Sequence, residues 1–286
     1  MNNFGEAPNA AHARPLLQAA QLTRRFGGLT AVNAVSVDLH VGEVHAVIGT
    51  NGAGKSTLIN MLSGEMPASS GTVLFNGLDI TAWSQPRRAR AGIGRSYQRT
   101  TIFPAFSVFE NCRLAAQAAQ PRPWALWEAA ARCGASVRAA HQALDAAGLH
   151  DDAQRSAGSL SHGGQRQLEI AMCVATRPRV LLLDEPLAGM GSEETDRMLK
   201  LLNTLKHGHA VLLVEHDMDA VFRVADRITV MVNGEVIASD LPQRIRSNRE
   251  VQIAYLGEDV DVSADVSTSV SASASSSHTT TSGRGH

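Results

Sequence analysis

The chain lacks the features of disulfide-bonded, zinc-binding or membrane-spanning proteins. Its three cysteines are widely spaced and form no Cys-x-x-Cys pair or Cys/His cluster, which favours a reducing compartment. No apolar run approaches the roughly 18 residues that a transmembrane helix needs. Residues 1–14 also lack the apolar core of a signal peptide. We therefore expect any membrane role to depend on a partner.

The chain also lacks an excess of charge of either sign. Its net charge is −1 over 286 residues, so no general basic field attracts nucleic acid, and we expect no nucleic-acid partner. With 44% hydrophobic residues, a chain of this length can bury a sizeable core without disulfides or metals. The composition therefore predicts a soluble globular protein.

The two ends differ in composition from the rest. Residues 259–286 are almost entirely Ser, Thr, Ala, Val, Asp and Gly, which cannot bury enough apolar surface to offset the entropy of ordering. We expect a disordered tail there, and a disordered N-terminus over residues 1–15. Residues 16–258 then form the folded domain.

Hydrophobic patterning within 16–258 predicts a mixed α/β domain. Continuous apolar segments at 44–48, 180–184 and 210–214 are typical of strands buried on both faces. Asn233-Gly234 predicts a hairpin turn between strands 226–232 and 235–239. Further strands are expected at 16–22, 32–39, 72–75 and 92–97, with helices at 55–62 and 193–206 and a mostly helical insertion within about 100–176. The order predicts early antiparallel strands, a parallel core and an inserted helical subdomain.

The most informative motif follows the strand at 44–48. It has the spacing G-x-x-x-x-G-K-[ST] and precedes apolar residues at helical spacing, the context of a phosphate-binding loop. Backbone N–H groups and the helix dipole favour an anion there. Lys55 would reach the β- and γ-phosphates, and the Ser56 hydroxyl would hold Mg²⁺. The loop residues predicted to bind ATP are Gly49, Thr50, Asn51, Gly52, Ala53, Gly54, Lys55, Ser56 and Thr57.

Two adjacent acids end the buried strand at 180–184. Because side chains alternate along a strand, Asp184 and Glu185 are expected to point in different directions. Asp184 suits the Mg²⁺ shell, and Glu185 is the candidate base that polarises the attacking water. Beside a phosphate loop, this pattern predicts hydrolysis and not binding alone.

Two polar residues follow other strands of the expected core. His216 comes just after the strand at 210–214, where the carboxyl ends of parallel strands form a ligand crevice, and it is positioned to contact the γ-phosphate and the water. Gln98 follows the short strand through Tyr97, and its amide oxygen suits Mg²⁺ or water. A further helix start, Ser161 to Gly164, offers a second anion-binding end, although these residues alone favour a simple N-cap with a flexible lead-in.

In this order, the motifs resemble those of an ATP-binding-cassette (ABC) ATPase. Residues 49–57 resemble Walker A, Gln98 the Q-loop glutamine, residues 160–164 the LSGGQ signature, residues 180–185 Walker B with its glutamate, and His216 the switch histidine. Phe26 resembles the aromatic residue that stacks on adenine. The resemblance implies the fold of an ABC nucleotide-binding domain, a P-loop NTPase core with an antiparallel β subdomain and an inserted helical subdomain.

The resemblance also implies partners and cofactors. ATP and Mg²⁺ would be bound, with Ser56, Gln98 and Asp184 around the metal. Two subunits, identical or paralogous, would sandwich ATP head to tail between Walker A of one and Ser161 and Gly163 of the other. The implied assembly has transmembrane permease subunits, acts indirectly with a solute-binding protein, and places this chain peripherally on the cytoplasmic face of the inner membrane.

Finer features are similar to the ATPase subunits of branched-chain amino acid importers. These are the segments 92–98, 160–171, 188–190 and 248–258. The alternatives are a urea or short-amide importer ATPase, which shares much of this pattern, and a soluble, non-transport ABC ATPase. His162 replaces the first signature glycine and Gly164 the glutamine, while residues 188–191 lack the usual aspartate. Phe103, Phe106 and Phe109 are expected either to dock the permease or to fill the local core.

Overall fold

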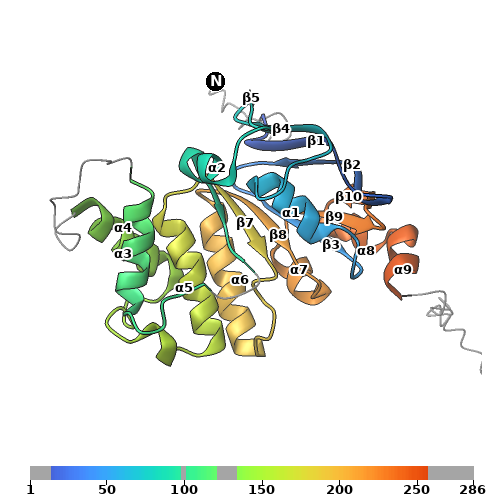
Figure 1. Ribbon diagram of the computed structural model, residues 1–286. Helices are drawn as coiled ribbons and strands as arrows, with labels where there is room; N and C mark the ends of the chain where they lie inside the picture. The colour runs from blue at the N-terminus through green and yellow to red at the C-terminus, as the bar shows by residue number, and fades with distance from the viewer. Residues whose placement is uncertain (1–13, 98–100, 121–133, 257–286) are drawn as a thin grey trace, which may run out of the picture.

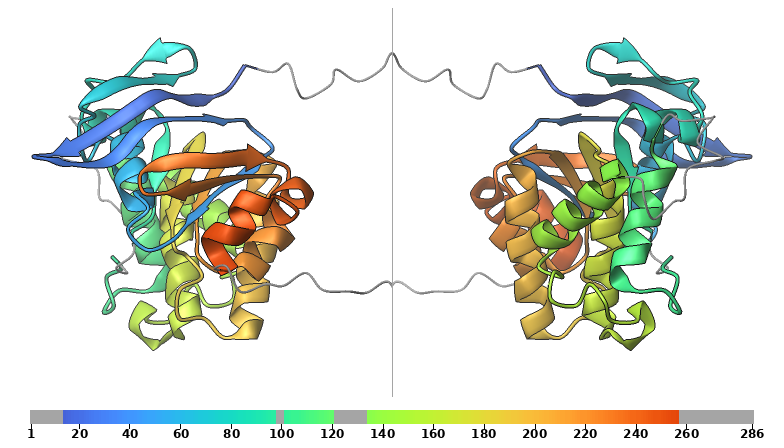
Figure 2. Two further views of the ribbon diagram at one scale, coloured as in Figure 1. Left: turned by 90° about the vertical axis from the view of Figure 1, so that its right-hand side faces the viewer. Right: turned by 90° about the vertical axis from the view of Figure 1, so that its left-hand side faces the viewer.

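The computed structural model describes residues 14–97, 101–120 and 134–256. The tail predicted at 259–286 and nearly all of the N-terminal segment 1–15 lie outside these residues. Two sheets lie at an angle to one another, with one helix between them and a group of helices at one end (Figure 1). Figure 2 shows the smaller sheet above the larger one.

The smaller sheet is antiparallel, as predicted for the early strands. Its order is β2-β1-β4-β5. The turn between β4 and β5 contains Asn76 and Gly77, with φ angles of 52° and 78°, which is the left-handed backbone of a tight hairpin. The strands are β1 (Leu17–Phe26), β2 (Leu29–Leu39), β4 (Ser70–Phe75) and β5 (Leu78–Asp79).

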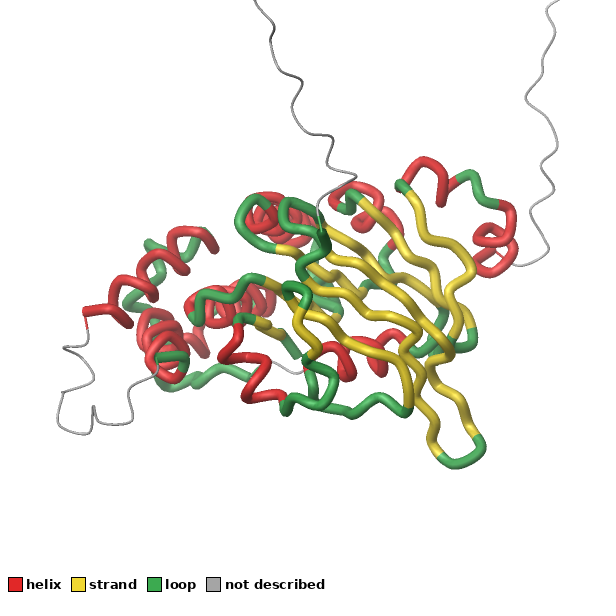
Figure 3. Tube along the Cα trace, turned by 90° about the horizontal axis from the view of Figure 1, so that it is seen from above, coloured by secondary structure: helices red, strands yellow, loops and turns green. Residues whose placement is uncertain are grey.

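The larger sheet has the order β10-β9-β3-β8-β7-β6. Its neighbouring strands are parallel except for the hairpin of β9 and β10, which turns at Asn233-Gly234 as predicted. Figure 3 shows the strands of the two sheets from above. The strands are β3 (Val44–Gly49), β6 (Ile93–Arg95), β7 (Val180–Asp184), β8 (Ala210–Val214), β9 (Arg227–Val232) and β10 (Glu235–Asp240).

The central strands β3, β7 and β8 are buried along their whole length, which explains their uninterrupted apolar sequence. Alternation divides β7 between two cores. Leu181 and Leu183 pack with the helical side, whereas Val180 and Leu182 pack with the helix between the sheets. The carboxyl ends of β3, β7 and β8 therefore lie along one edge, where the candidate site residues follow.

Helices cover both faces of the larger sheet. Helix α1 packs between the two sheets, and α3 to α6 cover the other face in one shared core (Figure 1). A third, smaller core lies under α7 to α9. The bounds are α1 (Lys55–Ser63), α2 (Gln85–Ala91), α3 (Val108–Ala118), α4 (Gly134–Ala147), a 3₁₀ turn (Ala157–Ser159), α5 (His162–Ala175), α6 (Ser192–Lys206), α7 (Met218–Val224), α8 (Pro242–Arg246) and α9 (Arg249–Leu256).

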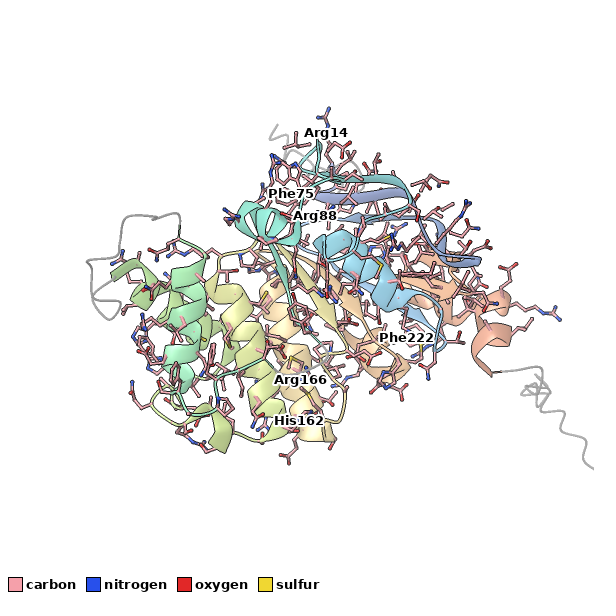
Figure 4. The ribbon with its side chains drawn as sticks, in the orientation of Figure 1. Arg14, Phe75, Arg88, His162, Arg166 and Phe222 are labelled. Carbon is pink, nitrogen blue, oxygen red and sulfur yellow. The ribbon has the colours of Figure 1, made fainter. Side chains whose placement is uncertain are left out.

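Helix α2 was not predicted, because its sequence is polar and has no apolar periodicity. It is held by buried Arg88, whose guanidinium donates to the carbonyl oxygens of Met61 and Leu62, each at 2.8 Å, at the end of α1. Figure 4 labels Arg88 where α2 meets α1. Gly92, with a φ of 111°, ends α2, so the strand predicted at 92–97 is shortened to β6.

Within the described residues, every helix is too short or too polar to cross a lipid bilayer.

Candidate nucleotide-binding site

The loop from Gly49 to Gly54 joins the end of β3 to the start of α1, as predicted. Gly54 is the N-cap of α1 with a φ of 96°, a left-handed conformation that favours glycine. A Cβ atom at Gly49 would lie 2.2 Å from the carbonyl oxygen of Met231, and one at Gly54 would lie 2.3 Å from that of Ala31. Glycine is therefore required at both positions because the backbone of neighbouring strands closes around the loop.

Lys55 lies over this loop and is itself buried, at 7% exposure. Its Nζ donates to the carbonyl oxygens of Gly49, at 2.7 Å, and Thr50, at 3.1 Å. Burial lowers the pKa of Lys55, and the carboxylates of Glu185 and Asp184 oppose that shift. The predicted lysine and the two predicted acids thus share one electrostatic environment.

Asp184 ends β7 and is 3% exposed. Its Oδ2 lies 3.5 Å from Nη2 of Arg95, while its buried Oδ1 has no hydrogen-bond partner in the described part of the chain. Burial raises the pKa of Asp184, opposed chiefly by the charge of Arg95. An unpartnered carboxylate oxygen fits a bound cation, so Asp184 and the exposed hydroxyl-bearing Ser56 suit Mg²⁺.

Glu185 follows directly and has an unusual backbone. Its φ is 49°, in the left-handed backbone region that residues other than glycine, asparagine and aspartate rarely adopt. Its N–H donates to the Val214 carbonyl oxygen at 2.9 Å, which ties this turn to the end of β8. Glu185 is half-buried, whereas Asp184 is buried, and their predicted roles as base and metal partner stay predictions.

His216 lies two residues beyond β8 with its side chain 59% exposed. Glu215, which sequence analysis did not assign, is 1% exposed and accepts from the N–H groups of Leu187, at 2.8 Å, and His216, at 3.2 Å. It therefore joins the segment after Glu185 to the segment that carries His216. The signal for it was its place at a buried strand end, where an acid needs partners.

Arg95 is a second residue that sequence analysis missed. Its Nη1 donates to Ser63 Oγ at 2.9 Å and pairs with Glu65 at 2.5 Å, while its guanidinium lies 4.9 Å from the centre of the Tyr97 ring. These contacts orient it toward Asp184. The predicted Q-loop residue Gln98 lies outside the described residues.

The signature segment begins α5, at the lower edge of the molecule where Figure 4 labels His162. Ser161 is the N-cap, and its Oγ accepts from the Gly164 N–H at 3.1 Å. Ser161 and Gly163 also contact Glu194 of α6, whereas no hydrogen bond among the described residues joins them to the phosphate loop. Within one chain, the structure therefore brings together the loop, Asp184 and Glu185, but not the signature.

Phe26 ends β1 on the smaller sheet and is 42% exposed. The Arg24 guanidinium lies over its ring, 4.7 Å from the ring centre. An exposed aromatic ring beside a cation offers a flat surface for a base to stack on. Its predicted adenine contact stays a prediction.

Comparisons with known proteins match nearly all of the described chain. The ABC transporter family matches residues 32–188, and the branched-chain amino acid ATP-binding cassette transporter family matches residues 235–261. The high-affinity branched-chain amino acid transport ATP-binding protein LivG of Escherichia coli is 39% identical over 255 residues, covering 86% of this chain and 99% of LivG. BraF of Pseudomonas aeruginosa, described in the same words, is 39% identical over 254 residues, covering 86% of this chain and 99% of BraF.

A solved structure is also similar. The crystal structure of the ADP conformation of an ATP-binding cassette of an ABC transporter has a TM-score of 0.76 and 29% identity. It covers 86% of this chain and 100% of that chain. This similarity confirms the predicted fold class.

Proposed function

Because this chain belongs to the ABC transporter family, we propose that it is the ATP-hydrolysing subunit of an importer for branched-chain amino acids. The observation that carries the ATPase assignment is the convergence of Lys55, Asp184 and Glu185 at the carboxyl edge of the larger sheet. The choice of solute is supported by the match over residues 235–261 and by the names of LivG and BraF.

Each nucleotide group has a candidate partner in the chain. Phe26 stacks on the adenine, and the N–H groups of the loop Gly49 to Thr57 surround the phosphates. Lys55 exchanges its two carbonyl partners for the β- and γ-phosphates. Ser56 and Asp184, with Gln98, hold Mg²⁺, which when bound neutralises charge on the phosphate oxygens.

Hydrolysis then falls to Glu185 and His216. Glu185 accepts a proton from water while the water oxygen bonds to the γ-phosphorus, and the bond from that phosphorus to the ADP oxygen breaks. His216 hydrogen-bonds the γ-phosphate, and Glu215 keeps its segment aligned with that of Glu185. A second subunit, identical or paralogous, completes the site with Ser161 and Gly163.

The segment after Gln98 supplies the proposed surface for permease docking. Phe103 and Phe106 are 51% and 46% exposed and stack with ring centres 5.5 Å apart. The buried amide of Asn111 accepts from the Phe103 N–H at 2.7 Å, so the exposed pair stands on a fixed backbone. Phe109 instead packs against the helical core, which supports the core alternative for this residue alone.

A separate groove of about 350 Å³ lies next to β6. It is lined by residues of α2, β6, α3 and α5, including Pro86, Tyr97 and Ala115. Phe103 and Phe106 do not line this groove, so it is a second candidate surface for an apolar segment of a partner.

Purification of the tagged protein from native membranes tests the proposal. We expect permease subunits and a second cassette to co-purify, and we expect branched-chain amino acids with their binding protein to stimulate ATP hydrolysis. Stimulation by urea or short amides alone would assign the other importer class. Hydrolysis with no membrane partner would favour a soluble ATPase.

Docking is tested by Phe103→Ala and Phe106→Ala. Each is expected to reduce co-purification of the permease while ATP binding is retained. Leu78→Ala is the control, because Leu78 is 56% exposed on β5, away from this surface. Unchanged complex yield in both phenylalanine variants rules out docking through them.

A further inference from the structure

The starts of α5 and α6 are joined by a carboxylate. Glu194, in the first turn of α6, accepts from Ser161 Oγ at 2.7 Å and from the Gly163 N–H at 3.3 Å, both through its Oε1. These are the two signature residues that the proposed sandwich assigns to the γ-phosphate of the other subunit. One oxygen of this chain therefore already uses both donors.

The contact has the character of an anion site and not of a chance neighbour. A hydroxyl and a backbone N–H at the start of a 14-residue helix converge on one negatively charged oxygen. The hydrogen bond from Ser161 lowers the pKa of Glu194, so the charged form is favoured there. A Cβ at Gly163 would lie 2.5–2.8 Å from the Glu194 carboxylate, so the missing side chain is what makes room for it.

A second contact involves the same segment. The Nε2 atom of His162, which replaces a signature glycine, lies 3.3 Å from the Ala188 carbonyl oxygen. Ala188 is three residues beyond Glu185, and the Ala188 N–H donates to the Glu185 carbonyl oxygen at 3.2 Å. The signature is thus connected within one subunit to the turn that carries the proposed base.

We propose that Glu194 is a positioning residue. In the separate subunit its carboxylate binds the Ser161 hydroxyl and the Gly163 N–H, the donors meant for the γ-phosphate, and it must release both when the ATP sandwich closes. The proposal rests on the head-to-tail dimer of the proposed function. Two anions cannot share donors at hydrogen-bond distance without strong repulsion, so phosphate and carboxylate compete. ADP has no γ-phosphate to displace the carboxylate. After hydrolysis Glu194 therefore binds Ser161 and Gly163 again, which favours separation of the two subunits.

The test measures ATP-dependent dimerisation in a Glu185→Gln background, where turnover does not consume the nucleotide. Sedimentation velocity gives the ATP concentration at half-dimerisation for the Glu185→Gln parent and for the same protein carrying Glu194→Gln or Glu194→Ala. We expect this concentration to fall about fivefold to tenfold in both variants, since a charge-assisted contact no longer has to be broken. Damage to the fold would raise it instead, and thermal melting checks that each variant is folded.

Glu193→Gln is the matched control, because Glu193 is an exposed acid in the same turn of α6. It removes the same charge without touching Ser161 or Gly163, and its dimerisation threshold is expected to stay within about twofold of the parent. If Glu194→Gln behaves like Glu193→Gln, or dimerises less readily, the proposal is wrong while the sandwich stands. If neither the parent nor any variant dimerises with ATP, the sandwich between two identical copies of this chain is wrong, and the proposal for such a dimer falls with it.

Discussion

Two helix starts in this chain carry glycines and offer N–H groups to an anion, and they are built differently. The loop before α1 is enclosed by the backbone of other strands, at Met231 beside Gly49 and at Ala31 beside Gly54. The start of α5 is bordered instead by the side chain of Glu194. The loop before α1 therefore has a fixed shape, whereas the start of α5 is bound by a side chain that can rotate away.

The difference separates two tasks of one ATP site. Fixed backbone N–H groups bind phosphates with little reorganisation, which suits the half that holds the nucleotide. A side-chain occupant lets the other half respond to the γ-phosphate, which suits the half that closes. In the half that holds the nucleotide, Lys55 donates to the carbonyl oxygens of its own loop and must exchange these partners for phosphate oxygens.

Glu185→Gln sharpens this comparison most, because it leaves both helix starts intact and removes only the proposed base. Turnover is expected to fall by about 10²–10⁴-fold while ATP affinity stays within about twofold. Single-turnover phosphate release and equilibrium nucleotide binding measure the two. Lys55→Ala is the contrasting variant and should weaken ATP binding itself. Rapid hydrolysis by Glu185→Gln would exclude Glu185 as the base.

Gly49→Ala tests the rigidity of the α1 loop. The added methyl group would lie 2.2 Å from a carbonyl oxygen of β9, so either the strand or the loop must move. We expect the free energy of unfolding to fall by about 3 kcal/mol. Urea denaturation measures it. A loss below about 1 kcal/mol would show that the loop yields as easily as the start of α5.

Acid is expected to weaken the sheet beneath the α1 loop. His45 of β3 is 2% exposed, its Nε2 lies 2.8 Å from Thr229 Oγ1, and burial lowers its pKa to about 4. The unfolded chain therefore binds a proton at higher pH than the folded chain, and the stability due to His45 is lost as pH falls from about 6.5 to 4.

As pH falls from 7 to 5, the free energy of unfolding is expected to fall by about 2 kcal/mol because of His45. Urea denaturation at both pH values, compared with His45→Gln, isolates it, because glutamine has no titrating group. Equal pH dependence in both proteins would exclude His45 as the source.

Gly163→Ala carries the smallest expected effect. Its methyl group meets the end of a flexible side chain, Glu194, which can rotate away. We expect the free energy of unfolding to change by less than about 1 kcal/mol, in contrast to Gly49→Ala. The same urea series measures both. A loss as large as that at Gly49 would mean that the two helix starts are equally rigid.

Segments with a strong local pattern were predicted well. The continuous apolar strands β3, β7 and β8, the hairpin at Asn233-Gly234 and the phosphate loop all have short-range signals that their own residues carry. Helix α2 has no such signal, since it depends on Arg88 reaching the carbonyl oxygens at the end of α1. Local periodicity cannot show a contact between elements that lie more than twenty residues apart.

The candidate site divides in the same way. Lys55, Asp184 and Glu185 could be singled out because each belongs to a recognisable motif that follows or ends a buried strand. Glu215, Arg95 and Glu194 could not, because each acts on a group from a distant segment, and an isolated acid or arginine is most often a solvated surface residue. The signature itself needed a family resemblance, since its residues alone describe an ordinary N-cap.

The left-handed backbone of Glu185 has a consequence for how this protein can change. A residue with a Cβ atom at a φ of 49° costs about 1 kcal/mol relative to glycine, so glycine here would give a more stable protein without its proposed base. A library of variants selected for heat resistance alone would therefore be enriched in inactive molecules at this position. Only selection for transport retains the glutamate. The residue found at position 185 therefore shows whether variants were selected for stability or for transport.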